Sequence, residues 1–374
     1  MTSRFFSFGR LGRWLTSVAG VVVCGTSGAQ VSQPSAIFGF VRTTLNGSGT
    51  QSGVTMVGPG FVEGVVQEAV LQAGAPRAFE LTAVNESWAA GAYATHATVS
   101  SHFVEVTSSS NLQAVGLASD IVSHTATTLR IADDWSGVLR GGESIVIRPH
   151  KTLASLFGAT NQAGLQAGDP LTADGVSLLN EGSSATISTY YYRDAGSTLG
   201  GTGWRSSANP FADETTRPIR AGQGVIVRRR SSAPLEVVLQ GFVKTGIWRR
   251  TLPQGFALVD PLAPLTDLRN AAPSAGAAFT LGGTASASVI PSGLTAAVAS
   301  GTPQTADLVT LAGSLASYYV AAPSGLSPGG WRLTSNPIVD QQNTVIPPAT
   351  AMLIQNRGAA KQWARPQPFV LSRP

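Results

Sequence analysis

Short apolar runs, separated by polar turns rich in glycine and proline, recur along most of the chain. Examples are Phe103-Val104-Glu105-Val106, Leu129-Arg130-Ile131, Ile145-Val146-Ile147, Gly224-Val225-Ile226-Val227 and Ala351-Met352-Leu353-Ile354. Runs this short, bounded by turn residues, are typical of buried β-strands. Only residues 152–157 show a pattern that predicts a helical turn. The pattern therefore predicts an all-β protein built from many short strands.

The composition strengthens this expectation and excludes three protein classes. The chain holds 42 glycines and 22 prolines, which disfavour long helices. Charged residues make up 12%, about half the usual share, which excludes coiled coils and helical arrays held by ion pairs. Hydrophobic residues make up 43%, which is enough to bury cores and excludes wholesale disorder.

The N-terminus has the layout of an export signal. Arg4, Arg10 and Arg13 precede an apolar run over residues 14–23, and small residues follow up to Ala29. The run is too short to span a bilayer and fits the apolar region of a secretory signal peptide. The sequence therefore predicts a signal peptide over residues 1–29 and an exported protein, either secreted, periplasmic or at the cell surface. A buried first strand and a lipid anchor on Cys24 are the alternatives.

Loss of this segment would change the charge and the thiol content. The formal net charge would fall from +5 to +2, because three arginines and no acidic residue would leave. Proteins that bind polyanions keep a large basic excess, so nucleic acid is not an expected partner. Cys24 is the only cysteine, so the mature chain would contain no disulfide. No later stretch reaches the roughly 18 apolar residues of a membrane span.

Part of the sequence occurs twice. Residues 191–230 align without gaps on residues 318–357, at an offset of 127. The shared positions include Tyr191/Tyr318, Tyr192/Tyr319, Trp204/Trp331, Arg205/Arg332 and Asp213/Asp340. In addition, Thr172-Ala173-Asp174 recurs as Thr305-Ala306-Asp307, and Gly39-Phe40-Val41 recurs as Gly241-Phe242-Val243. Self-similarity of this kind indicates two copies of one structural unit, beginning near Gly39 and Gly241.

These patterns divide the mature chain into four parts. The first strands of unit 1 are expected in residues 30–95, an insertion in 96–150, the remainder of unit 1 in 151–240 and unit 2 in 241–374. The insertion contains several short strand candidates separated by turns, which predicts a small SH3-like β-barrel. The expected fold is therefore all-β, with two copies of a sandwich-like or barrel-like unit and a small barrel inserted into the first.

Three features together resemble a known family. They are the strand-turn pattern over residues 102–107 and 120–129, the run Ile147-Arg148-Pro149-His150-Lys151-Thr152-Leu153, and the repeated Tyr-Tyr and Gly-Trp-Arg block. In these the chain resembles a family of exported, uncharacterised bacterial β-repeat proteins, known mainly from Verrucomicrobia and their relatives. The resemblance implies secretion and a repetitive β architecture, but it implies no activity and no catalytic residues. The Ala/Gly/Ser-rich residues 275–300 depart from a clean repeat.

The motifs associated with catalysis and metal binding give little support to an enzyme. Gly325-Leu326-Ser327-Pro328-Gly329 matches the nucleophile-elbow pattern, but Pro328 lacks the N–H group that such a turn needs for its oxyanion hole. The four histidines, His96, His102, His124 and His150, do not have the spacing of a zinc site. The sequence therefore predicts no catalytic residues, no metal site and no cofactor.

The acidic residues at turns have a structural interpretation. Asp133-Asp134 and Asp213-Glu214 are adjacent pairs, which a strand would point to opposite faces, so neither forms a catalytic dyad by itself. Asp213 and its counterpart Asp340 are expected to accept hydrogen bonds from backbone N–H groups of a turn. Calcium binding by this aspartate is the alternative, although no EF-hand-like loop accompanies it.

The repeated aromatic and basic residues are the candidate ligand-binding residues. They are Trp204, Arg205, Trp331, Arg332, Tyr191, Tyr192, Tyr318 and Tyr319. Trp and Tyr rings stack on sugars and partner proteins, and Arg supplies hydrogen-bond donors. In the other interpretation, which we favour, each Trp fills the core of its own unit and each Arg holds a loop. The basic clusters Arg228-Arg229-Arg230 and Trp248-Arg249-Arg250 are further candidates, as a patch for anionic glycan or phosphate.

Three functions remain open at this point. The favoured one is an exported, non-enzymatic β-repeat protein with a structural or adhesive role, whose partners are glycans or other surface proteins. The alternative is a carbohydrate-binding protein that uses the Trp, Tyr and Arg residues. The third is a polysaccharide-acting hydrolase whose site is assembled from scattered carboxylates. The sequence does not indicate an oligomeric state.

Overall fold

The protein is nearly all β, as the sequence pattern predicts. The computed structural model describes residues 37–49, 53–74, 78–93, 95–96, 99–196, 201–263, 281, 293–298, 302–312, 316–324 and 329–365. Strands make up 46% of the structure and helices 3%. The predicted signal peptide and the Ser327 motif lie outside the described residues, so both stay predictions. Among the described residues no helix has the length and apolar character needed to cross a membrane.

The one α-helix of the described residues lies where the sequence predicts it. Helix α1 (Leu153–Phe157) begins after Thr152, whose side chain accepts a hydrogen bond from the backbone N–H of Ser155. The hydroxyl of Ser155 in turn accepts from the backbone N–H of Thr152, which completes a capping box. Leu153, Leu156 and Phe157 are buried, so the helix is held by its apolar face.

A central part of the chain forms a curled six-stranded sheet, which we call the barrel sheet. Its order is β3 (Gln67–Val70), β10 (Ser144–Pro149), β7 (His102–Ser108), β8 (Ala118–His124), β9 (Thr128–Ile131) and β4 (Glu80–Thr82). A bridge between Leu71 and Ala83 joins the two edge strands. The side chains of one face form a separate core that includes Trp88 and Trp135. A further hairpin pairs β5 (Thr95–His96) with β6 (Val99–Ser100).

The barrel sheet corrects one predicted boundary. The sequence places the start of the insertion at residue 96, but β3 and β4 precede that residue and belong to the same sheet. Their apolar runs are short and interrupted by turns, so the sequence alone offers no reason to separate them from the strands before. Pairing with β10 and β9 assigns them to the barrel sheet. The comparison with SH3 barrels stays a prediction.

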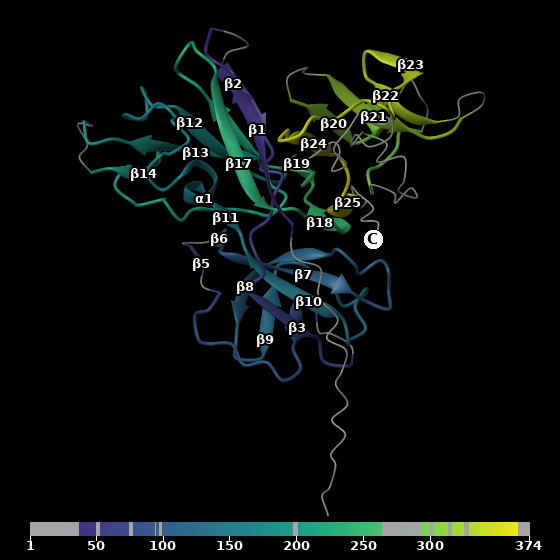
Figure 1. Ribbon diagram of the computed structural model, residues 1–374. Helices are drawn as coiled ribbons and strands as arrows, with labels where there is room; N and C mark the ends of the chain where they lie inside the picture. The colour runs from purple at the N-terminus through teal and green to yellow at the C-terminus, as the bar shows by residue number, and fades with distance from the viewer. Residues whose placement is uncertain are drawn as a thin grey trace, which may run out of the picture. The chain divides into compact units, whose positions relative to one another are not determined.

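The chain before and after the barrel sheet forms what we call the N-terminal half. Its main sheet has the order β14 (Gly203–Ser206), β13 (Thr186–Arg193), β12 (Gly175–Asn180), β16 (Val225–Arg228) and β2 (Val54–Val57). Two smaller ladders pair β1 (Phe38–Leu45) with β17 (Leu235–Phe242), and β11 (Lys151–Thr152) with β15 (Pro218–Ile219). Figure 1 shows β1 and β17 as a long antiparallel ribbon pair.

The remaining strands form the C-terminal half. Its main sheet has the order β19 (Gly255–Val259), β24 (Met352–Asn356), β20 (Leu308–Leu311), β21 (Ser317–Ala321), β22 (Gly330–Leu333) and β23 (Asn336–Asp340). A second ladder pairs β18 (Trp248–Leu252) with β25 (Lys361–Arg365). A 3₁₀ turn (Pro303–Thr305) precedes β20.

The two halves share one order of strands. In the N-terminal half, β2, β12, β13, β14 and β16 form the main sheet, and the first strand, β1, pairs with the last, β17. In the C-terminal half, β19, β20, β21, β22 and β24 repeat this order, and β18 pairs with β25 in the same way. A duplicated unit would produce this correspondence, which supports the duplication that the sequence predicts. The duplication itself stays a prediction.

The predicted starting points of the two units need correction. Gly39 and Gly241 are not equivalent positions, because they lie opposite each other in the ladder between β1 and β17. The repeated Gly-Phe-Val motif therefore marks two paired strands of one half. Strand β18, which begins at Trp248, is the counterpart of β1.

The two halves contact each other through reciprocal bridges. Val57 at the end of β2 bridges to Thr350, and Val259 at the end of β19 bridges to Gln223. Gln223 and Thr350 are 127 positions apart, the same offset as in the sequence repeat. Next to these bridges, Gly224 permits the two halves to approach each other closely. A Cβ atom at this position would lie only 2.4 Å from Cβ of Ala351.

Candidate functional site

Trp204 is a core residue of the N-terminal half. Its side chain is fully buried beside Phe157 and Tyr192, with ring centroids 5.9 and 5.7 Å away. Its indole Nε1 donates a hydrogen bond of 2.9 Å to the backbone oxygen of Gly158, at the end of α1. This environment agrees with the core interpretation, because a buried ring offers no face to a ligand in this conformation.

Trp331 is in a different environment. It is half-buried and packs against the core of the C-terminal half, which includes Tyr318. Among the described residues no aromatic ring stacks on it. The core interpretation therefore holds more fully for Trp204 than for Trp331.

Arg205 and Arg332 each hold a loop, in the same way. Nη1 of each donates to the carbonyl of the preceding Trp, and Nη2 donates to the carbonyl three positions back, Thr202 or Gly329. Each also pairs with an aspartate eight positions later, Asp213 at 3.3 Å and Asp340 at 3.2 Å. Both guanidinium groups are largely occupied by these contacts, so they are poorly placed to bind a ligand.

The two aspartates confirm the predicted turn interaction. Oδ1 of Asp213 accepts from the backbone N–H of Thr215 at 3.0 Å, and Oδ1 of Asp340 accepts from that of Gln342 at 3.1 Å. Among the described residues no group of His, Cys, Asp and Glu has the geometry of a metal site.

Strand register corrects the alignment of the tyrosines. Tyr191 lies opposite Arg205 in the ladder of β13 and β14, whereas Tyr319, and not Tyr318, lies opposite Arg332 in the ladder of β21 and β22. Tyr190 is therefore the counterpart of Tyr318, and Tyr191 that of Tyr319. The loop that follows differs in length by one residue, which an ungapped alignment does not detect in a run of tyrosines. These four side chains are buried, and only Tyr192 is partly exposed.

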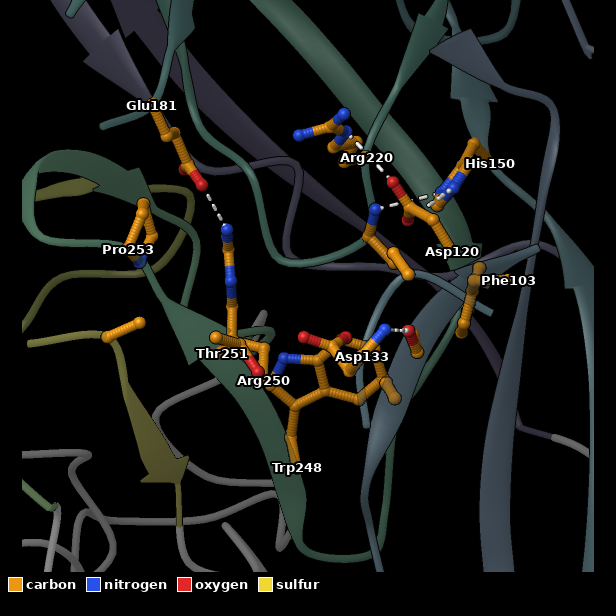
Figure 2. Close-up of a pocket in the computed structure, with 15 residues that line it drawn as sticks. Phe103, Asp120, Asp133, His150, Glu181, Arg220, Trp248, Arg250, Thr251 and Pro253 are labelled. Atoms are coloured by element: carbon orange, nitrogen blue, oxygen red, sulfur yellow. Dashed lines mark hydrogen bonds and ion pairs between the residues drawn. The ribbon is translucent and has the colours of Figure 1, made fainter. Parts of the chain in front are cut away.

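A cleft of about 270 Å³, lined by charged side chains and aromatic rings, lies where the barrel sheet and both halves meet (Figure 2). The barrel sheet contributes Phe103, Ser119, Asp120, Asp133 and His150; the N-terminal half contributes Glu181 and Arg220; and the C-terminal half contributes Trp248, Arg250 and Thr251. Clefts at junctions between structural units are common ligand sites. None of the eight candidate residues from the sequence repeat lines this cleft.

Asp120 is the central charged residue of the cleft. Its Oδ2 lies 2.9 Å from Nε of Arg220, and its Oδ1 lies 3.1 Å from Nε2 of His150. Burial raises the pKa of Asp120, but His150 and Arg220 outweigh this effect and hold the pKa below its usual value. Asp120 is therefore an ionised carboxylate at neutral pH. Nδ1 of His150 accepts from the backbone N–H of Ala221 at 3.0 Å, which assigns the ring proton to Nε2.

Glu181 and Arg250 form a second ion pair in the cleft (Figure 2). Burial raises the pKa of Glu181, although Arg250 and Arg220 partly oppose the shift. Arg250 also donates to the backbone oxygen of Gly222 at 2.8 Å. Only 4% of the Glu181 side chain and 10% of the Arg250 side chain are exposed, so this pair is almost fully buried.

Aromatic rings form the floor of the cleft. Phe103 stacks on His150 with centroids 5.2 Å apart and meets Trp248 edge-on at 5.8 Å. Nε1 of Trp248 and Oε1 of Glu181 are buried and have no hydrogen-bond partner among the described residues. Buried polar atoms without partners cost about 1–3 kcal/mol each. Trp248 and Glu181 therefore supply one donor and one acceptor that the described residues do not satisfy.

The exposed polar groups of the cleft are Arg220 and Asp133. The Arg220 side chain is 45% exposed, and its Nε faces Asp120, so its two Nη groups are available. Asp133 is half-buried, and its backbone N–H donates to the hydroxyl of Ser119 at 3.0 Å. No hydrogen bond or ion pair of the Asp133 carboxylate is found among the described residues. A guanidinium and a carboxylate are thus open to a ligand.

Sequence reasoning found parts of this cleft but did not connect them. The sequence marks the Trp248-Arg249-Arg250 cluster and the Asp133-Asp134 pair, but only as separate features. Asp120, Glu181 and Arg220 carry no local motif, and they come together only through the contacts between the barrel sheet and the two halves. The sequence signal that could have helped is the strand-turn pattern around Asp120 and His150, which the family resemblance also includes.

Comparison of the chain with protein-family models, with curated proteins and with solved structures gives no match. The family resemblance and the export prediction therefore rest on the residues alone.

Proposed function

We propose that the chain is an exported, non-enzymatic protein that binds carbohydrate in the cleft between the barrel sheet and the two halves. The observation that carries this proposal is the pair of open polar groups, Arg220 and Asp133, in a cleft that the rings of Phe103 and Trp248 also line. Sugar hydroxyls both donate and accept hydrogen bonds, and planar charged side chains can bind two of them at once. An adhesive role follows if the bound sugar belongs to a surface glycan.

The charge arrangement favours binding over hydrolysis. A glycosidase needs a protonated carboxyl group within reach of the glycosidic oxygen and a second, ionised carboxylate. Asp120 has a lowered pKa and is ionised, and it is already engaged by Arg220 and His150. Glu181 has a raised pKa, but its side chain is 4% exposed and paired with Arg250. Neither Asp120 nor Glu181 is therefore placed as an accessible general acid in this arrangement.

Binding to an array of surface glycans, followed by calorimetry on the best oligosaccharide, tests the proposal. Arg220→Gln should weaken binding about tenfold or more, because it removes a charged donor from the cleft. Arg42→Gln is the matched control, since Arg42 lies on β1, is exposed and does not line the cleft. We expect the control to bind like the unmodified protein.

Two outcomes would contradict the proposal. One is the absence of binding to any glycan, or binding that Arg220→Gln leaves unchanged. The other is cleavage of a polysaccharide that Glu181→Gln abolishes, which would establish the hydrolase alternative. Chromatography of oligosaccharides after long incubation detects such cleavage.

A further inference from the structure

The acidic residues of the cleft differ in whether a cation neutralises them. Asp120 lies within ion-pair distance of Arg220, and Glu181 within that of Arg250. His150 accepts from the backbone N–H of Ala221 through Nδ1 and faces Asp120 through Nε2, so its contacts are with these two residues. Asp133 is the third acidic residue, and it has no cationic partner among the described residues. Asp133 is therefore the carboxylate of the cleft that is free to pair with a cationic ligand.

Asp133 is held in place at the wall of the cleft. Its backbone N–H donates to the hydroxyl of Ser119 at 3.0 Å, and the next residue, Asp134, turns away to accept from the backbone N–H of Ser136 at 2.9 Å. Asp134 does not line the cleft, whereas the side chain of Asp133 does (Figure 2). The two adjacent acidic residues therefore have different roles. Asp134 accepts a hydrogen bond from the backbone, and Asp133 faces the cleft.

We infer that the cleft selects amino sugars, and that the Asp133 carboxylate binds the protonated amine. This inference rests on the proposed carbohydrate site and specifies its ligand class. A carboxylate in a half-buried position attracts an ammonium group more strongly than a hydroxyl, because the pair is only partly screened by water. The Nη groups of Arg220 and the floor atoms of Trp248 and Glu181 remain for the sugar hydroxyls.

The site differs from a simple acidic patch because two buried polar atoms near it, Nε1 of Trp248 and Oε1 of Glu181, lack hydrogen-bond partners among the described residues. Trp248 is 1% exposed, yet its Nε1 has no acceptor, and the Glu181 side chain is 4% exposed, yet its Oε1 has no donor. A ligand hydroxyl can donate to a carboxylate oxygen and accept from an indole N–H. Both atoms are enclosed in this conformation, so a ligand that contacts them must displace the side chains around them slightly.

The test compares two sugars that differ only in the amine. Calorimetry or ligand-observed NMR should show that glucosamine oligomers bind about threefold to tenfold more tightly than the matching glucose oligomers, at a pH at which the amine is protonated. Asp133→Asn should abolish this preference, so that the variant binds the glucosamine and the glucose oligomers with equal affinity. The preference should also decrease with added salt.

Asp134→Asn is the matched control, because it removes the same charge one residue away, outside the cleft. It should keep the preference for the amine. Equal loss of preference in both variants would indicate general attraction by an acidic surface and would overturn the inference. Equal binding of the two sugars by the unmodified protein would overturn it as well, while leaving the proposed carbohydrate site standing. Failure of both sugars, and of the glycan array, would reject the proposed function itself.

Discussion

Two hairpins with the same Gly-Trp-Arg sequence reach different degrees of burial. In the N-terminal half, Trp204 is fully buried and its Nε1 donates to the end of helix α1. In the C-terminal half, Trp331 is half-buried. The adjacent arginines nevertheless make the same contacts in both hairpins, to two loop carbonyls and to Asp213 or Asp340.

The difference shows which interactions a repeated sequence can specify. The contacts of Arg205 and Arg332 involve only residues of the same hairpin and the turn after it, so the same residues produce the same network. The burial of Trp204 depends on Phe157 and Gly158, which lie 46 or more positions earlier in the chain. The hydrogen bonds and ion pair of the arginine are therefore the same in both hairpins. The burial of the tryptophan instead depends on which residues from other parts of each half pack against it.

Truncation of the two tryptophans should show the largest effect. Trp204→Ala should lower the free energy of unfolding by about 3–5 kcal/mol, because it leaves a large cavity and removes the hydrogen bond to Gly158. Trp331→Ala should cost about 1–2 kcal/mol, since less apolar surface leaves water there on folding. Urea melts measure both. Equal losses in the two variants would contradict the comparison.

The buried aspartates directly before strands β12 and β20 of the two main sheets offer a second comparison. Asp174 accepts from the backbone N–H groups of Gln166 and Arg230 and pairs with Arg229, while Asp307 accepts from those of Thr295 and Arg357 and pairs with Lys361. Asp174→Ala should cost about 3 kcal/mol or more, because Arg229 would be left buried without its partner.

Asp307→Ala should cost less than Asp174→Ala. The Lys361 side chain is 18% exposed, against 6% for Arg229, so water can solvate it when the carboxylate is removed. Urea melts of the two variants at neutral pH measure the difference. A larger loss for Asp307→Ala would show that the backbone contacts, and not the buried cation, decide the stability at this position.

Asp260 is expected to make the stability of the C-terminal half depend on pH, whereas the N-terminal half has no ionisable side chain at the equivalent position. Register places Gly58 at the equivalent position of the N-terminal half. Burial raises the pKa of Asp260 to about 6, although the N–H groups of Gly60 and Leu262 and the charge of Arg365 oppose the shift. The folded state therefore favours the protonated form of Asp260. The contribution of this group to the free energy of unfolding is fully present below the pKa of the unfolded state, near 4, and is lost as the pH rises through about 6.

The loss across this window should be on the order of 3 kcal/mol or less. Asp260→Asn stays neutral at every pH, so its stability should change less between pH 4 and about 6.5 than that of the unmodified protein. Glu236→Gln, at an exposed pair with Arg42, is the control and should keep the original slope. An unchanged slope in Asp260→Asn would show that other groups cause the pH dependence.

The smallest effect is expected for the exposed partners of the two arginines. Asp213 and Asp340 have side chains that are 69% and 45% exposed, so each ion pair is largely solvated. Asp213→Ala and Asp340→Ala should each cost at most about 1 kcal/mol, mainly through the lost turn hydrogen bond. Thermal melts in low and high salt separate the two contributions. Losses well above this value would mean that the turns anchor more of each half than the local contacts indicate.

The sequence by itself determined the local structure of this protein. Apolar runs such as Ile145-Val146-Ile147 form strands, and residues 152–157 contain the helical turn. Asp213 and Asp340 accept hydrogen bonds in turns. All these features depend on neighbours within a few positions of the chain. The tertiary structure alone decided the register of the tyrosines, the assignment of β3 and β4 to the barrel sheet, and the cleft. Asp120, Glu181 and Arg250 lie far apart in the chain, and contacts between separate sheets bring them together, so no local pattern could record their proximity.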